Sequence, residues 1–158
     1  MTAPLLSLYR RLSCWPGGRW LFTRAVCFKA PYFASISPRI TLLEPGRCEG
    51  RLADRRKVRN HIGSVHAIAM CNLAELTAGL MVDASLPADM RWIPKGMDVR
   101  YQAKAHGTLK AVAVPELAIA IATAGYELPV RVGITDAAGT EVFFARIAMW
   151  VSPRRGNG

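Results

Sequence analysis

The clearest hydrophobic pattern in the chain is a long apolar stretch at residues 64–82. Apolar side chains recur there at the spacing of a helix, namely Val65, Ala69, Leu73, Leu76 and Leu80. Ser64 is placed to act as the N-cap, because its hydroxyl can accept a free backbone N–H. The other faces are also apolar or small, so this pattern predicts a helix that is buried on all sides.

Shorter apolar stretches on both sides of this helix predict strands. They cover residues 40–44, 48–54, 91–102, 108–114, 128–135 and 141–151. Pro45-Gly46 and residues 136–139 supply turns between neighbouring strands. Residues 116–124 fit a strand or a helical turn, and we assign them to the sheet. A lone apolar helix between strands must be covered by a curved sheet, so the pattern predicts an α+β fold with a central helix wrapped by five to six antiparallel strands.

The N-terminal segment has a different pattern from the rest. Leu5, Leu8 and Leu12 follow helical spacing, and Pro16-Gly17-Gly18 ends the pattern, which predicts one short amphipathic helix. Residues 19–35 interleave aromatic and cationic side chains. Such a segment either lies on a membrane surface or packs its rings on its own domain and leaves the cations in water.

The chain is long enough for one domain. We expect residues 1–35 to pack on a main domain at residues 36–152, with residues 153–158 as a flexible basic tail. No stretch is long and apolar enough to cross a membrane, and no secretory signal is recognisable. The four cysteines lack a CxxC pair, which predicts reduced thiols in a cytoplasmic protein.

The net charge of +10 is concentrated in the first third of the chain. Residues 1–59 hold twelve Lys/Arg and three Asp/Glu, a balance of +9, whereas residues 60–158 hold nine and eight, a balance of +1. A basic surface attracts phosphates of a cofactor, a nucleic acid or a lipid headgroup, or simply aids solubility. No nucleic-acid-binding motif is recognisable. The densest cluster, a candidate for cofactor phosphates, is Arg55, Arg56, Lys57 and Arg59.

Polar residues on the predicted apolar helix indicate chemistry. Asn72 and Glu75 are three residues apart and share a face. The start of the helix, near His66, offers free backbone N–H groups that can stabilise a developing oxyanion. A carboxylate can attack an acyl carbon or activate water to do so. His66 and Glu75 lie about 180° apart around the helix, so they do not easily serve one site in a single chain. A two-fold dimer could place Glu75 of one chain near the helix start of the other.

The residues from Asn60 to Glu75 resemble the helix-start motif of hotdog-fold thioesterases, in which a His precedes an acid by nine residues. The likeness is to the phenylacetate-pathway thioesterases and an uncharacterised subgroup near them. It continues in residues 16–22, 30–33 and 101–107, and runs from about residue 16 to 151.

This resemblance implies a hotdog fold and a homodimer or a dimer of dimers. It implies that Glu75 is the nucleophile or general base, and that His66 and the backbone N–H of Ala67 or Ile68 polarise the thioester carbonyl. Asn60, His61 and Asn72 are further candidates for substrate binding. The substrate would be an acyl-CoA or an acyl-carrier thioester, so coenzyme A enters only as part of the substrate.

Two other functions remain open from the sequence. Ala67 and Ile68 stand where active thioesterases carry glycines, which favours a non-catalytic protein that binds acyl-CoA or lipid. The basic, aromatic first third favours a peripheral binder of membranes or nucleic acid. The histidines lack metal-ligand spacing, so no metal site is expected.

Overall fold

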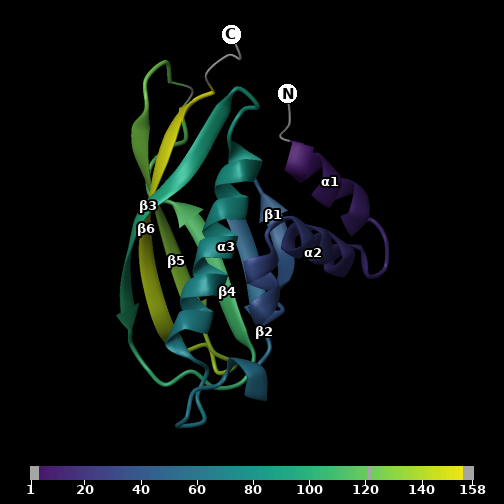
Figure 1. The fold of residues 1–158 in the computed structure, drawn as a ribbon, viewed down its shortest axis with the longest axis vertical. Coiled ribbons are helices and arrows are strands. Elements are labelled where there is room, and N and C mark those ends of the chain that lie inside the picture. The colour runs from purple at the N-terminus through teal and green to yellow at the C-terminus, as the bar shows by residue number, and fades with distance from the viewer. Residues whose placement is uncertain (1–3, 121, 155–158) are drawn as a thin grey trace.

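The computed structural model describes residues 4–120 and 122–154 (Figure 1). Its helices are α1 (Pro4–Ser13), α2 (Gly18–Lys29) and α3 (Ala67–Ser85), with short 3-10 helices η1 (Pro31–Ile36) and η2 (Arg56–Val58). The strands are β1 (Arg39–Glu44), β2 (Arg47–Leu52), β3 (Met90–Tyr101), β4 (Leu109–Pro115), β5 (Tyr126–Thr135) and β6 (Glu141–Pro153).

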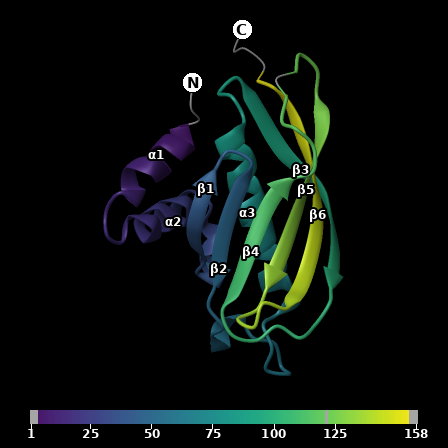
Figure 2. The same cartoon turned by 180° about the vertical axis from the view of Figure 1, so that it is seen from behind.

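The strands form one antiparallel sheet in the order β1-β2-β4-β5-β6-β3. The sheet curves around α3, and α1 and α2 lie beyond β1, on the side of the molecule away from β3 (Figures 1 and 2). The predicted α+β architecture, with a central helix and six strands, is therefore confirmed.

The core lies between α3 and the concave face of the sheet. Leu73, Ala74 and Met81 are fully buried on α3. A Cβ at Gly50 would lie 2.7 Å from Thr77 Cγ2, so the glycine lets β2 approach the helix closely. Contrary to the prediction that no stretch is long and apolar enough to cross a membrane, α3 is so by length and composition, but 72% of its apolar window is buried inside the fold. The apolar character of α3 thus matches that of a core helix.

The start of α3 differs from the prediction. The helix begins at Ala67 with His66 as the N-cap, whereas Ser64 lies in the preceding loop. The backbone there is held extended, because Val65 N–H donates to the Ala105 carbonyl at 2.9 Å and His66 N–H donates to the Val58 carbonyl at 2.8 Å. These bonds to neighbouring segments prevent the helix from starting at Ser64.

The prediction that the helix is buried on all sides was also wrong. Ile68 is 55% exposed, and Cys71 and Glu75 are half-buried. The sheet wraps one side of α3 and ends at the edge strand β3, which leaves this stripe of the helix open.

The predicted short N-terminal helix is present as α1, and a second helix, α2, follows it that was not predicted. Gly17, with φ of 79°, makes the sharp turn between α1 and α2. The pair is anchored on β1, because Tyr9 O–H donates to the Thr41 carbonyl at 3.2 Å and Ile40 N–H donates to Thr23 Oγ1 at 3.0 Å. The sequence pattern hid α2, because α2 carries apolar residues on both its inner and its outer faces.

Two segments near the ends of strands also correct the predictions. Residues 116–120 and 122–124 form a loop instead of a strand. At the C-terminal end, Pro153 belongs to β6, and Arg154 N–H donates to the Asp89 carbonyl at 2.7 Å. The start of the predicted flexible tail is therefore tied to the fold, and residues 155–158 lie outside the described residues.

Candidate functional site

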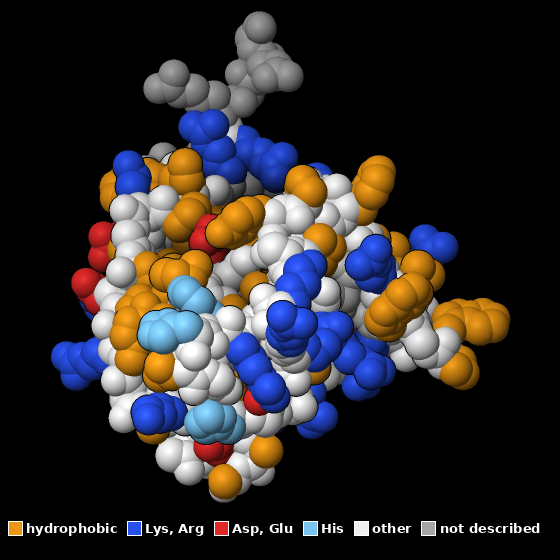
Figure 3. Space-filling model, turned by 60° about the horizontal axis from the view of Figure 1, so that its bottom comes forward, with side chains coloured by type: hydrophobic (Ala, Val, Ile, Leu, Met, Phe, Trp, Pro, Cys, Tyr) orange, Lys and Arg blue, Asp and Glu red, His pale blue; other side chains and the backbone are white. Residues whose placement is uncertain are grey.

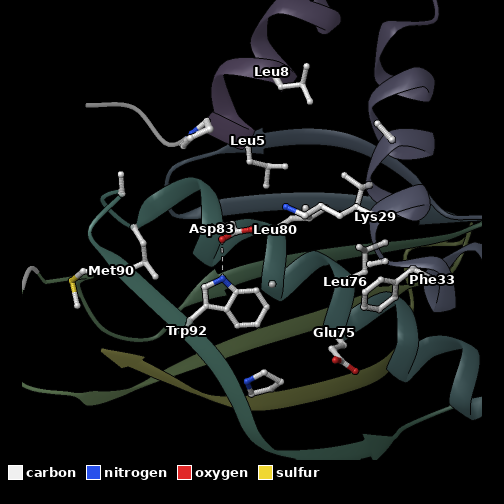
Figure 4. A pocket seen from close by; sticks show the side chains of 18 of the residues that line it. Leu5, Leu8, Lys29, Phe33, Glu75, Leu76, Leu80, Asp83, Met90 and Trp92 are labelled. Carbon is white, nitrogen blue, oxygen red and sulfur yellow. Dashed lines mark hydrogen bonds between the residues drawn. The ribbon is translucent and has the colours of Figure 1, made fainter. Parts of the chain in front are cut away.

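A cavity of about 680 Å³ opens between the N-terminal helices and the core helix (Figure 4). We call it the acyl groove, after the acyl chain that the resemblance to thioesterases leads us to expect there. Its walls come from α1, α2 and η1 on one side and from α3 and β3 on the other. The lining is mostly apolar, including Leu5, Leu8, Val26, Phe33, Leu76, Leu80, Met90 and Trp92. Such size and composition suit a small-molecule ligand with an apolar body.

Glu75 lies at one end of the acyl groove, beside Phe33 (Figure 4). Its side chain is half-buried. Among the described residues, no hydrogen bond or ion pair engages its carboxylate. A carboxylate held at an apolar cavity and left uncommitted is available to a ligand or a water molecule.

Asn72 lies one helical turn before Glu75 and is 94% buried. Its Nδ2 donates to Ser35 Oγ at 3.2 Å, which ties α3 to η1. Its Oδ1 is buried and has no hydrogen-bond partner among the described residues. An unsatisfied buried acceptor costs about 1–3 kcal/mol, so this amide oxygen is a favourable position for a donor supplied by a ligand or by water.

Trp92 forms the wall of the acyl groove opposite α1. Its Nε1–H donates to Asp83 Oδ1 at 3.0 Å, which fixes the indole over α3 (Figure 4). Gly79 makes this position possible, because a Cβ there would lie 2.7 Å from Trp92 Cη2. Glu75, Gly79 and Asp83 are spaced by four residues, so one face of α3 lines the groove.

His66 caps the start of α3 with its side chain. Ile68 N–H donates to His66 Nδ1 at 3.1 Å. Because Nδ1 accepts this bond, the proton of the neutral ring lies on Nε2, which is free to donate. The same bond occupies the Ile68 N–H, so of the two predicted oxyanion donors from the backbone only that of Ala67 is left.

Asn60 is committed to the loop before α3 instead of facing a ligand. Its Oδ1 accepts from the N–H groups of Ile62 at 3.1 Å and Ser64 at 3.2 Å, and its Nδ2 donates to Ser64 Oγ at 2.9 Å. His61 is exposed at the tip of this loop. The amide of Asn60 therefore shapes the loop that presents His66.

Of the four cations at residues 55–59, two interact with neighbouring groups and two form no such interaction among the described residues. Arg59 Nε pairs with Asp54 Oδ1 at 2.6 Å, and Arg55 Nη2 donates to the Ser37 carbonyl at 3.2 Å. Arg56 and Lys57 are exposed and form no ion pair among the described residues. Figure 3 shows that Lys and Arg side chains gather on this face of the molecule.

Asp54 joins two loops on this face. Besides Arg59 it accepts from Gly107 N–H at 2.9 Å. The hydrogen bond from Arg59 is the main cause that lowers the pKa of Asp54 below its usual value, although burial opposes it. A carboxylate whose pKa is lower in the folded state than in the unfolded state stabilises the fold at pH values above its pKa in the unfolded state. This stabilisation is lost as the pH falls through its pKa in the folded state.

The Asp54→Asn variant tests this junction. We expect it to lose about 1 kcal/mol of unfolding free energy at neutral pH, the usual contribution of one such hydrogen bond. The wild type should lose this advantage on acidification below about pH 4, so the two proteins should converge. Urea unfolding at neutral and acidic pH measures it, and a difference that stays constant with pH would contradict the assignment.

Sequence reasoning did not identify Tyr101 as a site residue. Its Oη lies 3.4 Å from Cys71 Sγ, at the open side of α3. This contact is the main cause that raises the pKa of Tyr101 to about 12, so the phenol stays protonated at neutral pH. Nothing in the sequence pairs these residues, which are thirty positions apart on different elements.

The structure places Glu75 at the acyl groove. Asn72 lies one turn before it on α3 but is not among the residues that line the groove, and His66 lies apart from both. Nine residues of helix separate His66 and Glu75, a rise of about 13 Å. The groove is also lined by Phe33, Gly79 and Trp92, none of which was predicted to be a site residue. The glycine inside an apolar helix was the one available signal.

The family model described as domain of unknown function DUF4442 matches residues 18–151. No curated protein matches the chain. A crystal structure from a genomics project shares 43% identity and a TM-score of 0.80, over 95% of this chain and 99% of that one.

More distant structures share the fold. A Pseudomonas aeruginosa protein of unknown function, described as a probable thioesterase, has a TM-score of 0.72 and 23% identity over 81% of this chain and 91% of its own. A Haemophilus influenzae thioesterase has a TM-score of 0.68 and 13% identity over 80% and 87%. The chain therefore belongs to the DUF4442 family, and its fold is that of the hotdog thioesterases.

Proposed function

We propose that this protein hydrolyses acyl thioesters, with the acyl chain in the acyl groove and Glu75 at the thioester. The observation that carries the proposal is the position of Glu75, a half-buried carboxylate without a partner among the described residues, at one end of an apolar cavity of about 680 Å³. An apolar cavity selects the acyl chain, and the carboxylate supplies the base or nucleophile that ester cleavage requires.

The chemistry needs no redox partner. As a general base, Glu75 takes a proton from water while the water oxygen attacks the acyl carbon. The carbon–sulfur bond then breaks, and the leaving thiolate takes up a proton, which gives a carboxylic acid and a thiol. As a nucleophile, Glu75 would instead form a mixed anhydride that water hydrolyses.

His66 reaches the thioester in this proposal from the second subunit of a homodimer. The edge strand β3 supports such a pairing, because an exposed edge strand readily adds another strand. Exposed apolar residues Ile68, Ile93 and Tyr101 lie on or beside that edge. His66 Nε2–H would then donate to the carbonyl oxygen, with the Ala67 N–H beside it. A dimer of dimers would use the same pairing.

Arg56 and Lys57 are the cations best placed to bind the phosphates of a coenzyme A substrate. They are exposed and form no ion pair among the described residues, whereas Arg55 donates a hydrogen bond to the Ser37 carbonyl and Arg59 pairs with Asp54. A location in the reducing cytoplasm agrees with four free cysteines.

The experiment is a hydrolysis panel of short, long and aromatic acyl-CoA thioesters, beside an acyl-carrier thioester and an oxygen ester of the same chain. We expect turnover of at least one thioester and much slower turnover of its oxygen ester. Absence of turnover across the panel would overturn the proposal.

A second candidate is a non-catalytic acyl-CoA or lipid carrier. The observation that favours it is Ile68, whose branched side chain stands 55% exposed at the helix start, where the resembled thioesterases have glycine. Tight binding of acyl-CoA without turnover would establish this function. The Ile68→Gly variant separates the two, because a blocked thioesterase should gain turnover and a carrier should not.

Gly79→Ala should shift the chain-length preference. The added methyl meets the indole of Trp92 at 2.7 Å, so the ring must tilt into the acyl groove. Each acyl methylene that is excluded costs about fourfold in binding, and we expect kcat/KM for a long thioester to fall about tenfold relative to a short one. Alanine favours the helix by about 1 kcal/mol over glycine, so the fold should persist. An unchanged ratio would show that the acyl chain lies elsewhere.

A further inference from the structure

The outer surface of the N-terminal helices carries large apolar side chains in contact with water. Half of the exposed large hydrophobic residues of the described chain lie in this short segment, namely Leu8, Trp15, Trp20, Leu21, Phe28 and Tyr32. Phe28 is 91% exposed, and Trp15 is 72% exposed. A concentration of this kind on one surface marks an interaction site.

The arrangement on α2 is that of one continuous stripe. Trp20, Arg24 and Phe28 are spaced four residues apart, so they follow one line along the helix, and Leu21 flanks it. The opposite face of α2 is buried through Phe22 and Thr23. The outer stripe is therefore not needed for folding, because the inner face alone anchors α2 on the domain.

The charge around the stripe has a single sign. Residues 4–43 contain six Lys/Arg and no Asp or Glu. On the side of the molecule that holds α1 and α2, Figure 3 shows hydrophobic side chains projecting with Lys and Arg among them. Aromatic and leucine side chains interleaved with cations are typical of surfaces that insert between anionic lipid headgroups.

The stripe is also continuous with the acyl groove. Ala25 and Lys29 of α2 line that groove, and they lie next to Leu21 and Phe28 on the same helix. The free edge of β3 is on the other side of the molecule (Figures 1 and 2). Docking through α2 therefore places the groove beside the bilayer and leaves β3 accessible for a second subunit.

We propose that α2 and the preceding turn at Trp15 dock this protein on the surface of an anionic lipid bilayer. Trp20, Leu21 and Phe28 enter the headgroup region, and Arg19 and Arg24 contact the lipid phosphates. This proposal does not depend on hydrolysis, since it rests on the outer face of α2 alone.

The test is co-sedimentation of the full chain with vesicles of phosphatidylcholine alone and of equal parts phosphatidylcholine and phosphatidylglycerol. We expect binding to the anionic vesicles that weakens between about 0.1 M and 1 M salt, as the Debye length shrinks from about 10 Å to about 3 Å. Phe28→Ser should lower the partition coefficient about tenfold, the loss expected when a phenyl ring no longer enters the apolar phase. Arg24→Gln should lower it about fivefold on anionic vesicles.

The matched control is Leu117→Ser, which removes a side chain that is 58% exposed in the loop after β4. It should bind vesicles like the wild type. Circular dichroism should show that all variants keep the fold, because each change is at an exposed position. Absence of vesicle binding, or equal binding by Phe28→Ser and Leu117→Ser, would overturn the proposal. A change in sedimentation without vesicles in Phe28→Ser alone would assign the stripe to a protein contact and overturn it too.

Discussion

Replacing Phe22 with alanine should lower the free energy of unfolding by about 3–5 kcal/mol, the usual cost of removing a buried phenyl ring. Phe22 is fully buried between α2 and the domain. Its ring meets that of Tyr9 edge-on, with centroids 5.0 Å apart, so the change also removes a contact between α1 and α2. Urea unfolding followed by circular dichroism measures the difference.

Phe28→Ala on the same helix is the matched control for this prediction. It removes the same ring from a position that is 91% exposed, and we expect a change within about 0.5 kcal/mol. A single transition in Phe22→Ala would show that α1 and α2 unfold with the sheet. Equal stability of the two variants would contradict the packing of α2 on β1.

The sheet and its helix were predictable from the sequence because each carries a strong local pattern. Leu73, Leu76 and Leu80 repeat at helical spacing and all are buried on α3. Turn residues such as Pro45-Gly46 mark the hairpin of β1 and β2. The fold class follows from these patterns and from the need to cover one apolar helix.

The residue at which α3 begins and the presence of α2 could not be predicted from such patterns. Whether α3 starts at Ser64 or at Ala67 is decided by hydrogen bonds from Val65 to Ala105 and from His66 to Val58, which are tertiary. In α2 the apolar residues of the outer stripe mask the period of the inner face. A periodicity argument assumes that exposed positions are polar, and α2 breaks that assumption.

The candidate site was predictable only in part, for the same reason. The spacing of Asn72 and Glu75 predicts a shared face of α3, but only Glu75 lines the acyl groove, whereas Asn72 is buried. The groove itself arises where α1, η1 and β3 meet α3, and no local pattern places Trp92 over Gly79. The sequence thus predicted a candidate residue, Glu75, whereas the cavity beside it arises from the packing of distant segments.

Replacing Glu75 with glutamine should reduce thioester hydrolysis by about a hundredfold to ten-thousandfold, the range that a positioned base contributes. Glutamine keeps the size of the side chain and removes its basicity. Glu75 has no hydrogen bond among the described residues, so the change breaks no contact and the unfolding free energy should stay within about 0.5 kcal/mol. Initial rates against the best thioester of the panel measure the loss in kcat, and binding of the substrate should persist.

Asp83→Asn is the matched control, because Asp83 lines the same groove two helical turns from Glu75. The amide oxygen of asparagine can still accept from Trp92 Nε1, so the wall of the groove is preserved. We expect turnover close to that of the wild type. A loss in Asp83→Asn with full activity in Glu75→Gln would assign the chemistry to the other end of the groove. Equal small losses in both would mean that the carboxylates only shape the charge of the cavity, and the acid-dependent mechanism would then be wrong.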